Sequence, residues 1–522
     1  MLIGQRAEET GRQTDRQLDC LIATDAYLDA VTVHFPFQNT YALLPEGFFA
    51  RVVPTPVLSP RLVKLNRPLA IRLGLDPDVL DSPEGAEILA GKRVPNGAEP
   101  IAMAYAGHQF GHFVPQLGDG RAILLGEVID VDGVRRDIQL KGSGPTPFSR
   151  RGDGRAALGP VLREYIVSEA MEALGIPTTR SLAAVVTGES VIRETALPGA
   201  VLTRVASSHI RVGTFQYFAA RGDIEGVRRL ADHVIARHYP ETVGAERPYH
   251  ALLAGAIARQ ADLVARWLLV GFIHGVMNTD NTSICGETID YGPCAFMDAY
   301  DPAAVFSSID EQGRYAYANQ PRIALWNLTR LAECLLPLFC EDKDKAIEQA
   351  QSILGEFAPR FTSAYQAGLR QKTGLLTEHE GDEALVQDLL DAMAKNRADF
   401  TLTFRRLSEA VLDSSGDQRV RLSFADPAAY DEWALRWRQR IDVEKSTPAA
   451  RSRAMLAVNP AFIPRNHRIE AVIQAAVNHD DFAPFEELLT VLSKPYEDQP
   501  AFSEYAQPPE PHQRVLQTFC GT

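Results

Sequence analysis

Apolar and polar positions first alternate clearly after Gly120. Two β-rich runs follow, Arg121 to Asp130 (RAILLGEVID) and Val134 to Leu140 (VRRDIQL). They are joined through Asp132-Gly133, a dipeptide that is typical of tight hairpin turns. The pattern predicts an antiparallel hairpin at the start of a sheet.

The period then changes from two residues to between three and four. Residues 156–174 carry apolar side chains at helical spacing, and Gly175 and Pro177 follow them, so this segment predicts a helix that ends there. Two more β-like runs come next, at 181–186 and 200–205. The sheet is therefore expected to continue after the helix.

After Gly213 the pattern becomes mainly helical. The most apolar stretch, Trp267 to Met277 (WLLVGFIHGVM), is predicted to be the buried end of a helix that finishes near Met277. Amphipathic periodicity continues at 324–410 and 428–440, which predicts scaffold helices. A sheet-rich half is thus followed by a helix-rich half.

The two ends of the chain differ from this pattern. Residues 1–100 are rich in proline and irregular, with a short helical segment at 68–73, and predict an extension that wraps the core. The tail from residue 495 is proline-rich and is expected to be extended. The fold class is therefore predicted as α+β, with an N-terminal extension and additional C-terminal helices.

Composition excludes several classes of protein. With 522 residues, 45% of them hydrophobic and 23% charged, the chain has ample material for one large core or two lobes. Its net charge of −14 argues against a non-specific nucleic-acid binder. The apolar stretch is too short to span a bilayer, and the N-terminus has no apolar signal core, so neither a membrane nor export is expected. We predict a cytoplasmic protein; the sequence gives no oligomeric state.

The segment His274 to Asn281 (HGVMNTDN) carries the clearest chemistry. Asp280 and Asn281 lie at its end, and Asp290 begins Asp-Tyr-Gly nine residues after Asn281. An amide and a carboxylate that hold Mg²⁺ against nucleotide phosphates, with another Asp that addresses the attacking hydroxyl, are typical of kinase-like sites. This spacing predicts nucleotide-dependent group transfer.

A second constellation lies in the sheet-rich half. Lys141 ends the second hairpin strand and Glu164 lies on the following helix, an arrangement that holds an ammonium against phosphates in kinase-like folds. Gly118 and Gly120 precede the first strand, where a kinase carries its glycine-rich loop, although the G-x-G-x-x-G spacing is absent. Together these residues predict a phosphate-binding site.

The run from His108 to His112 (HQFGH) has the spacing of a zinc-protease motif, with two imidazoles on one helical face. Gln109 stands where such an enzyme needs a general base, and an amide cannot accept a proton in that role. Both histidines are therefore predicted to be structural. The six cysteines are scattered without a CxxC pair, which argues against a zinc site or a disulfide framework.

Several long motifs together resemble the selenoprotein O family, also called YdiU-like. They are YAGHQFGHFVPQLGDGRA (105–122), QLKGSGPTPFSRRGDGRAALGPVLREY (139–165), HGVMNTDN, DYGPCAFMD (290–298) and NPAFIPRNHRIE (459–470). The resemblance implies a two-lobed, atypical protein-kinase-like (pseudokinase) fold. It also implies transfer of AMP from ATP to Ser, Thr or Tyr hydroxyls of proteins.

The resemblance further implies a role for each matching residue. Asp280 would be the catalytic base, Asn281 and Asp290 would hold Mg²⁺ or Mn²⁺, and Glu164 would orient Lys141. The residues implied to contact ATP, besides Asp290, are Gly118, Gly120, Arg121, Lys141, Asp153, Gly154, Arg204 and Arg211.

The implied division of the chain is an extension (1–100), a β-rich nucleotide-binding part (101–213), a helical part with the catalytic loop (214–494) and a tail (495–522). The tail contains Cys520, which matches a redox-active position of the family; a partner for it is not evident from the sequence. Spacing alone leaves open ordinary γ-phosphoryl transfer and a catalytically silent nucleotide-binding scaffold. The same residue types would serve all three functions.

Overall fold

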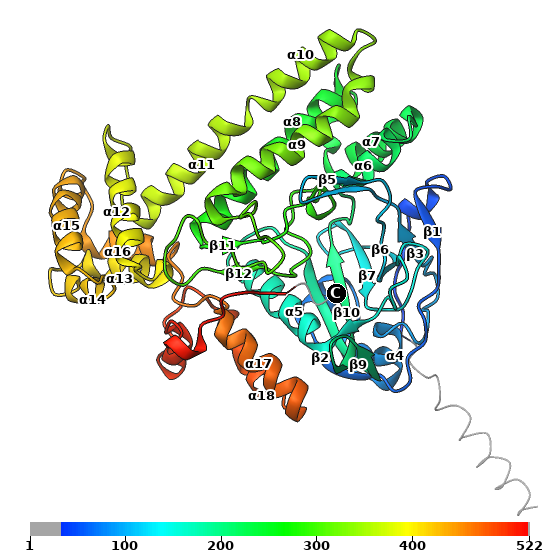
Figure 1. Cartoon of the computed structure of the whole chain (residues 1–522), viewed down its shortest axis with the longest axis horizontal. Coiled ribbons are helices and arrows are strands. Elements are labelled where there is room, and N and C mark those ends of the chain that lie inside the picture. Colours follow the sequence, from blue (N-terminus) through cyan, green and yellow to red (C-terminus); the bar gives the residue numbers. More distant parts are fainter. Residues whose placement is uncertain (1–32, 520–522) are drawn as a thin grey trace, which may run out of the picture.

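The structure, a computed structural model, describes residues 33–519. Cys520 and the first part of the predicted N-terminal extension lie outside the described residues. The chain forms an antiparallel sheet followed by a long series of helices, so the α+β prediction is confirmed (Figure 1). None of the helices in the described part is long and apolar enough to cross a bilayer.

The main sheet runs in the order β1-β3-β6-β7-β10-β9-β2, and the short β8 pairs with β10 outside this path. Every pair of neighbouring strands in it is antiparallel. Its strands are β1 (Phe49–Arg51), β2 (Arg61–Leu65), β3 (Ile101–Met103), β6 (Ala122–Ile129), β7 (Arg135–Lys141), β8 (Ala156–Ala157), β9 (Arg180–Ile192) and β10 (Ala196–Ala206).

The predicted hairpin is β6 and β7, which pair from Ala122 with Lys141 to Ile129 with Arg135. Gly133 has a φ of 78°, and the Asp130 carboxylate accepts the backbone N–H of Val134, so the turn is closed as its sequence predicts. The predicted helix is α5 (Leu158–Ala173), which packs against β9 and β10. These local predictions are confirmed.

The segment before residue 100 does more than wrap the core, because it contributes strands to the main sheet. Its strands β1 and β2 form the two outer edges of the main sheet, β1 beside β3 and β2 beside β9. Between β2 and β3 lie three short helices, α2 (Arg67–Arg72), α3 (Pro77–Leu80) and α4 (Pro83–Leu89). Strands of three and five residues gave no visible alternation in the sequence, so their place in the sheet was not predicted.

The helix before the segment that carries Asp280 ends earlier than predicted. Helix α8 (Pro248–Leu269) stops at Leu269 rather than near Met277, and Gly271 follows with a φ of 75°. Phe272 and Ile273 then form the short strand β11, which pairs with β12 (Ala295–Phe296). A glycine in the left-handed region followed by aromatic and β-branched residues ends the helix, although the apolar run continues.

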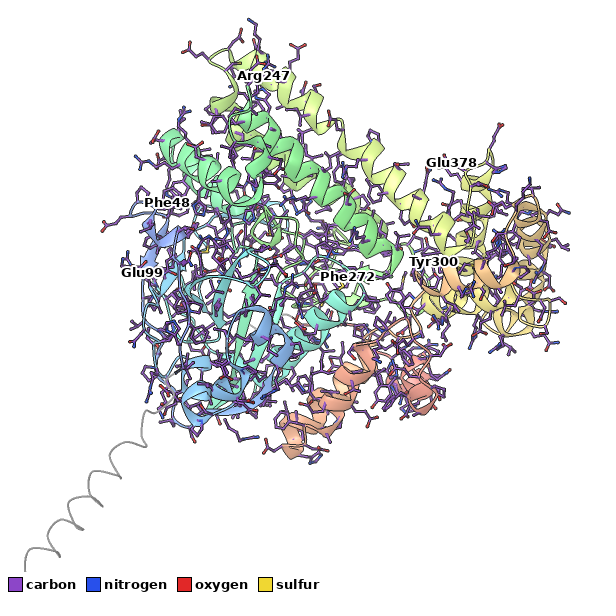
Figure 2. The ribbon with its side chains drawn as sticks, turned by 180° about the vertical axis from the view of Figure 1, so that it is seen from behind. Phe48, Glu99, Arg247, Phe272, Tyr300 and Glu378 are labelled. Carbon is purple, nitrogen blue, oxygen red and sulfur yellow. The ribbon has the colours of Figure 1, made fainter. Side chains whose placement is uncertain are left out.

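The helix-rich half extends from α6 onwards. The long helices α9 and α11 both pack against α8 (Figure 1). Figure 2 shows Phe272 on the side toward the sheet and Tyr300 where these long helices meet the smaller ones. The helices are α6 (Val212–Ala219), α7 (Ile224–His238), α9 (Gln320–Phe339), α10 (Lys343–Leu354), α11 (Phe357–Lys372), α12 (Asp382–Asn396), α13 (Phe400–Ala410), α14 (Asp417–Arg421), α15 (Pro427–Asp442), α16 (Pro448–Leu456), α17 (Asn466–His479) and α18 (Ala483–Leu492).

The tail is not simply extended. It contains two 3₁₀ turns, Pro500–Ala506 and Pro511–Gln513, and then returns to the body of the protein. There Thr518 forms a parallel bridge with Ser307, and its hydroxyl donates to the carbonyl of Pro293 at 2.6 Å. The tail therefore contacts the segment that follows Asp290.

Candidate functional site

The predicted pair between β7 and α5 is present. The Lys141 ammonium lies 2.6 Å from a Glu164 carboxylate oxygen and 3.1 Å from the Asp290 carboxylate. Lys141 is the last residue of its strand, and Glu164 lies two turns into the helix that packs on that sheet. One lysine thus joins the sheet, the helix and the loop that carries Asp290.

Two arginines from the end of β10 and just beyond it approach the same carboxylates. Arg204 donates to Glu164 at 2.5 and 2.9 Å and to Asp290 at 2.7 Å. Arg211 lies 3.4 Å from the other oxygen of Asp290. Asp290 itself has a φ of 64°, which is uncommon for a residue with a Cβ and directs its carboxylate to this point.

A third carboxylate in this cluster was not predicted. Asp119 lies between Gly118 and Gly120 in the quoted motif, and its side chain accepts from Arg211 at 3.3 Å and from the backbone N–H of Met103 at 3.1 Å. The Arg211 guanidinium also lies 4.3 Å from the centre of the Tyr105 ring. The only signal for Asp119 in the sequence was its place between the two glycines.

The cluster has balanced charges, with Lys141, Arg204 and Arg211 against Asp119, Glu164 and Asp290. Burial alone would raise the pKa of Asp290, but the charges of Arg204, Lys141 and Arg211 outweigh it and hold that pKa well below its usual value. Burial also raises the pKa of Glu164, but the charges of Arg204 and Lys141 outweigh it, so this pKa is lowered as well. Both carboxylates are therefore ionised at neutral pH.

Asp280 is in a different environment, in the 3₁₀ turn η3 (Thr279–Asn281). It is only 7% exposed, and burial raises its pKa to about 6. One of its carboxylate oxygens is buried without a hydrogen-bond partner, and the other lies 3.5 Å from the Gln109 amide nitrogen. A carboxylate whose pKa lies this near to neutrality is suited to accept a proton.

A small hairpin covers Asp280, formed by β4 (Gly107–Gln109) and β5 (His112–Val114). The helical reading of the His108 to His112 run is therefore wrong: Phe110 and Gly111, with φ of 52° and 88°, make a turn that places the two histidines on paired strands. The Gln216 amide nitrogen donates to His108 Nδ1 at 2.8 Å. This contact is what a structural histidine would make.

The backbone of the hairpin donates hydrogen bonds to the loop that carries Asp280. The N–H of His108 donates to the Thr279 hydroxyl at 2.7 Å, and the N–H of Phe110 donates to the Asn278 side chain at 3.0 Å. A Cβ added at Gly107 would lie 2.3 Å from an Asp280 oxygen. The absence of a side chain at residue 107 therefore allows the hairpin to approach Asp280 closely.

Asn281 follows Asp280 directly and is half-buried. Its amide nitrogen donates to the carbonyl of Val276 at 3.0 Å, which fixes the orientation of the side-chain amide. Within residues 33–519 no three His, Cys, Asp or Glu side chains converge to hold a metal by themselves. An Asn and an Asp supply two oxygen ligands, and this suits Mg²⁺, which usually takes its remaining ligands from phosphates and water.

The glycine segment packs on the loop after β7. Gly118 has a φ of 68°, and a Cβ there would lie 2.3 Å from the Phe148 ring. The Thr146 hydroxyl donates to the carbonyl of Asp119 at 2.6 Å, and the backbone N–H of Gly142 donates to the carbonyl of Arg121 at 2.7 Å. Close packing is thus one reason for the glycine at 118, beside any contact with phosphate.

Asp153 and Gly154 lie on the same loop but face another way. Asp153 pairs with Arg193 at 2.8 Å, and none of the hydrogen bonds or ion pairs of the described residues joins it to the Lys141 cluster. A Cβ at Gly154 would lie 2.1 Å from the backbone of Gly144, so this glycine closes the loop on itself. The structure therefore brings together Lys141, Glu164, Arg204, Arg211 and Asp290, and it places Asp153 apart from them.

The sequence profile of the family described as Protein adenylyltransferase SelO matches residues 31–493. Protein nucleotidyltransferase YdiU of Bradyrhizobium diazoefficiens is 79% identical over 492 residues, which cover 94% of this chain and 100% of that protein. Proteins of the same name from Bradyrhizobium sp. (strain ORS 278) and Rhodopseudomonas palustris (strain BisB5) are 76% and 73% identical, with the same coverage. The chain therefore belongs to the SelO family of protein adenylyltransferases.

Proposed function

We propose that this protein, a nucleotidyltransferase by its family, transfers AMP from ATP to Ser, Thr or Tyr hydroxyls of other proteins and releases pyrophosphate. The β-rich and helical parts would form the two lobes of a kinase-like enzyme with the site between them. The observation that carries the proposal is the convergence of Lys141, Arg204 and Arg211 on Glu164 and Asp290, close to the buried carboxylate of Asp280.

The three cations would bind the phosphate oxygens of ATP. Each is already oriented by a carboxylate, so little side-chain ordering is left to the binding step. Glu164 holds Lys141 and Arg204 in place, as its hydrogen bonds to both show. Gly118, Gly120, Arg121, Asp153 and Gly154 would contact the rest of the nucleotide; in the case of Asp153 this requires the loop to approach the cluster.

Asp280 would act as the base. As the acceptor hydroxyl attacks the α-phosphorus, Asp280 takes its proton, a new O–P bond forms, and the bond from the α-phosphorus to the bridging oxygen breaks. The electron pair leaves with pyrophosphate. The raised pKa of Asp280 supports this role because a base titrating near the working pH transfers protons most effectively.

Asn281 and Asp290 would hold a divalent cation, Mg²⁺ or Mn²⁺, which would neutralise charge on the phosphates. The donor set fits, since both side chains offer oxygen and both follow the proposed base in the chain, at positions 281 and 290. Asp290 now contacts three cationic side chains, and the phosphates of ATP would offer those side chains alternative partners.

The cluster could hold a triphosphate in either direction. The proposal that the acceptor attacks the α-phosphorus rather than the γ-phosphorus therefore rests on the family and not on the geometry. ATP labelled separately at the α- and the γ-phosphate tests this. Label should remain on protein from α-labelled ATP only. Retention from γ-labelled ATP alone would identify an ordinary kinase, and retention from neither would favour a silent scaffold.

Two variants test the roles. Asp280→Asn should leave ATP binding in place and lower the turnover by about 100-fold or more, since a positioned base contributes roughly that much. Asp290→Asn should abolish transfer and weaken metal-dependent ATP binding. Asp388→Asn is the matched control, because Asp388 is a surface carboxylate on α12 that pairs with Arg436. Normal turnover of the Asp290 variant would refute the metal assignment.

A further inference from the structure

The segments beside the catalytic loop carry no carboxylates of their own. Three segments surround that loop: the hairpin segment 105–117, residues 211–222 with α6, and residues 312–332 with the start of α9. None of the three contains an Asp or Glu, although Asp310, Glu311 and Glu333 adjoin the last of them. Apart from the buried Arg211 of the site, they contain Arg221, Arg314, Arg322 and Arg330. In a chain with a net charge of −14 this is a local excess of positive charge.

Two of these arginines lie on the same indole. The guanidinium of Arg314 is 4.9 Å from the Trp326 ring centre, and that of Arg330 is 5.0 Å from it. The His108 ring is 5.1 Å from Trp326, in an edge-to-face arrangement. We call Arg314, Arg330, Trp326 and the neighbouring Phe113, which is 41% exposed, the arginine face.

Of the two arginines on Trp326, Arg314 is the one whose charge is not balanced by an ion pair among the described residues. Arg330 has Glu333 at 2.7 Å, whereas Arg314 has no ion-pair partner within residues 33–519. The nearby Asp310 accepts the backbone N–H groups of Arg314 and Tyr315, not the guanidinium. Glycine at position 111 leaves room for the Arg314 guanidinium, since a Cβ there would lie 3.6 Å from its central carbon.

The arginine face is connected directly to the catalytic loop. The hydroxyl of Tyr315, the residue after Arg314, donates to the Asn278 side chain at 2.5 Å, and Asn278 lies two residues before Asp280. The same Asn278 oxygen accepts from the hairpin at Phe110. Arg314 is therefore one residue from a side chain that holds the loop carrying Asp280, and a polypeptide that reached Asp280 along the hairpin would pass Arg314.

We propose that the arginine face binds acidic residues of the protein substrate beside its acceptor hydroxyl, with Arg314 as the principal contact. This inference rests on the proposed function and adds the class of substrate. Guanidinium groups held over an aromatic ring are already ordered, and they pair well with carboxylates. Trp326 and Phe113 offer apolar surface to the neighbouring side chains of such a segment.

A nucleic acid fits this face less well than an acidic protein segment. Binding to a phosphate backbone requires many cations along a groove, and the strongly acidic remainder of the protein would repel an extended polyanion. A short acidic segment needs only the few arginines that are present. It also contains the hydroxyl group that the site is proposed to modify.

Paired synthetic peptides test the proposal. Each peptide carries Ser, Thr and Tyr acceptors, and the residues on both sides of every acceptor are either Glu or Gln. Transfer is followed with both α- and γ-labelled ATP. The full-length protein should modify the Glu peptide with a kcat/KM about tenfold above that of the Gln peptide, mainly through KM, and added salt should reduce the preference. Arg314→Gln should reduce the preference to about twofold or less.

Arg322→Gln is the matched control, because Arg322 is an exposed arginine of α9 that has no contact with Trp326 among those described. It should keep the preference of the unaltered protein. Arg314→Glu should shift the preference toward peptides flanked by Lys, a result that misfolding would not produce.

Equal transfer to the Glu and Gln peptides, or a preference unchanged in Arg314→Gln, would overturn the inference. Competition by polyuridylate that depends on Arg314 would assign the face to nucleic acid and also overturn it. Failure of the proposed function would look different. Protein or peptide would then retain label from γ-labelled ATP only, or from neither form of ATP, with both the Glu and the Gln peptides.

Discussion

Gly107 shows at the scale of one residue how closely the hairpin covers Asp280, the proposed base. Its backbone is in a β-strand without positive φ, so alanine is conformationally acceptable there and only space is limiting. A methyl group at this position would lie 2.3 Å from Asp280 and must displace the carboxylate or the hairpin.

We expect Gly107→Ala to lower the turnover of AMP transfer at least about tenfold, because misplacement of a catalytic group by about 1 Å is costly. ATP affinity, measured by calorimetry, should change little. Gly355→Ala at the end of α10, where a Cβ would have its nearest contact at 3.3 Å, is the control and should retain activity. Full turnover in Gly107→Ala would show that the hairpin leaves Asp280 before catalysis.

Lys372 gives a second prediction at this scale. It ends α11 and is 2% exposed, with its ammonium 4.5 Å from the Phe404 ring centre, and burial lowers its pKa to about 7. The unfolded chain keeps this proton up to about pH 10.5. Between pH 7 and 10.5 the unfolded state therefore binds more protons, so the stability of the folded protein increases with pH in this range.

Lys372→Met should thus stabilise the protein by several kcal/mol at or below pH 7, since each unit of pKa difference corresponds to about 1.4 kcal/mol. The gain should shrink above pH 7 and vanish near pH 10. Chemical denaturation over this pH range measures it. Lys395→Met, at an exposed position of α12, should show no such trend; an equal trend in both would contradict the assignment to Lys372.

At the scale of elements, Gln216 joins α6, the catalytic loop and the hairpin. Its carbonyl oxygen accepts from the Thr279 hydroxyl at 2.6 Å, and its amide nitrogen is 2.8 Å from His108 Nδ1. Burial lowers the pKa of His108, so the imidazole is neutral and Nδ1 can accept this hydrogen bond. One amide thus fixes the relative position of three elements.

Gln216→Leu should destabilise the protein by about 1–3 kcal/mol, because two buried polar groups lose their partner. Amide hydrogen exchange should become faster in 107–114 and 278–281 before it changes elsewhere. Gln349→Leu is a matched control, since Gln349 makes a similar 2.8 Å contact with His250 far from the site. Unchanged exchange in the hairpin would show that its backbone bonds to Asn278 and Thr279 suffice.

The elements also show what sequence could and could not predict. The β6–β7 hairpin, α5 and the Lys141–Glu164 pair were predictable because turn residues and periodicity act over short distances. The β4–β5 hairpin could not be predicted, since its turn requires a positive φ at Phe110, a residue type that does not favour this conformation. Nor was Asp119, whose partner Arg211 comes from a segment 92 residues away.

At the scale of the whole molecule, Arg465 joins three distant parts of the chain. It is 1% exposed and lies 2.5 Å from Asp298 in the segment after Asp290 and 2.9 Å from Asp399 at the start of α13. It also donates to the carbonyl of Ala506 in the tail at 2.8 and 3.0 Å. The C-terminal helices are thus fixed to the segment that follows the proposed metal ligand.

Arg465→Met should lower the free energy of unfolding by about 3–5 kcal/mol, because two carboxylates would lose their buried cation. Thermal unfolding by circular dichroism measures the loss. Arg468→Met, one turn further and more exposed, removes a weaker contact with Glu504 and should cost less than about 1 kcal/mol. An equal loss of unfolding free energy in both variants would mean that the ion pairs of Arg465 do not stabilise the fold.

The outer strands of the main sheet have a consequence for anyone who shortens this protein. Because β1 and β2 come from the proline-rich start of the chain, a version trimmed before residue 66 would lose both. The backbone groups of β3 and β9 that now pair with them would be left open, and unpaired strand edges are templates for association with other molecules. Such a version would keep every residue of the proposed site and still be prone to precipitate.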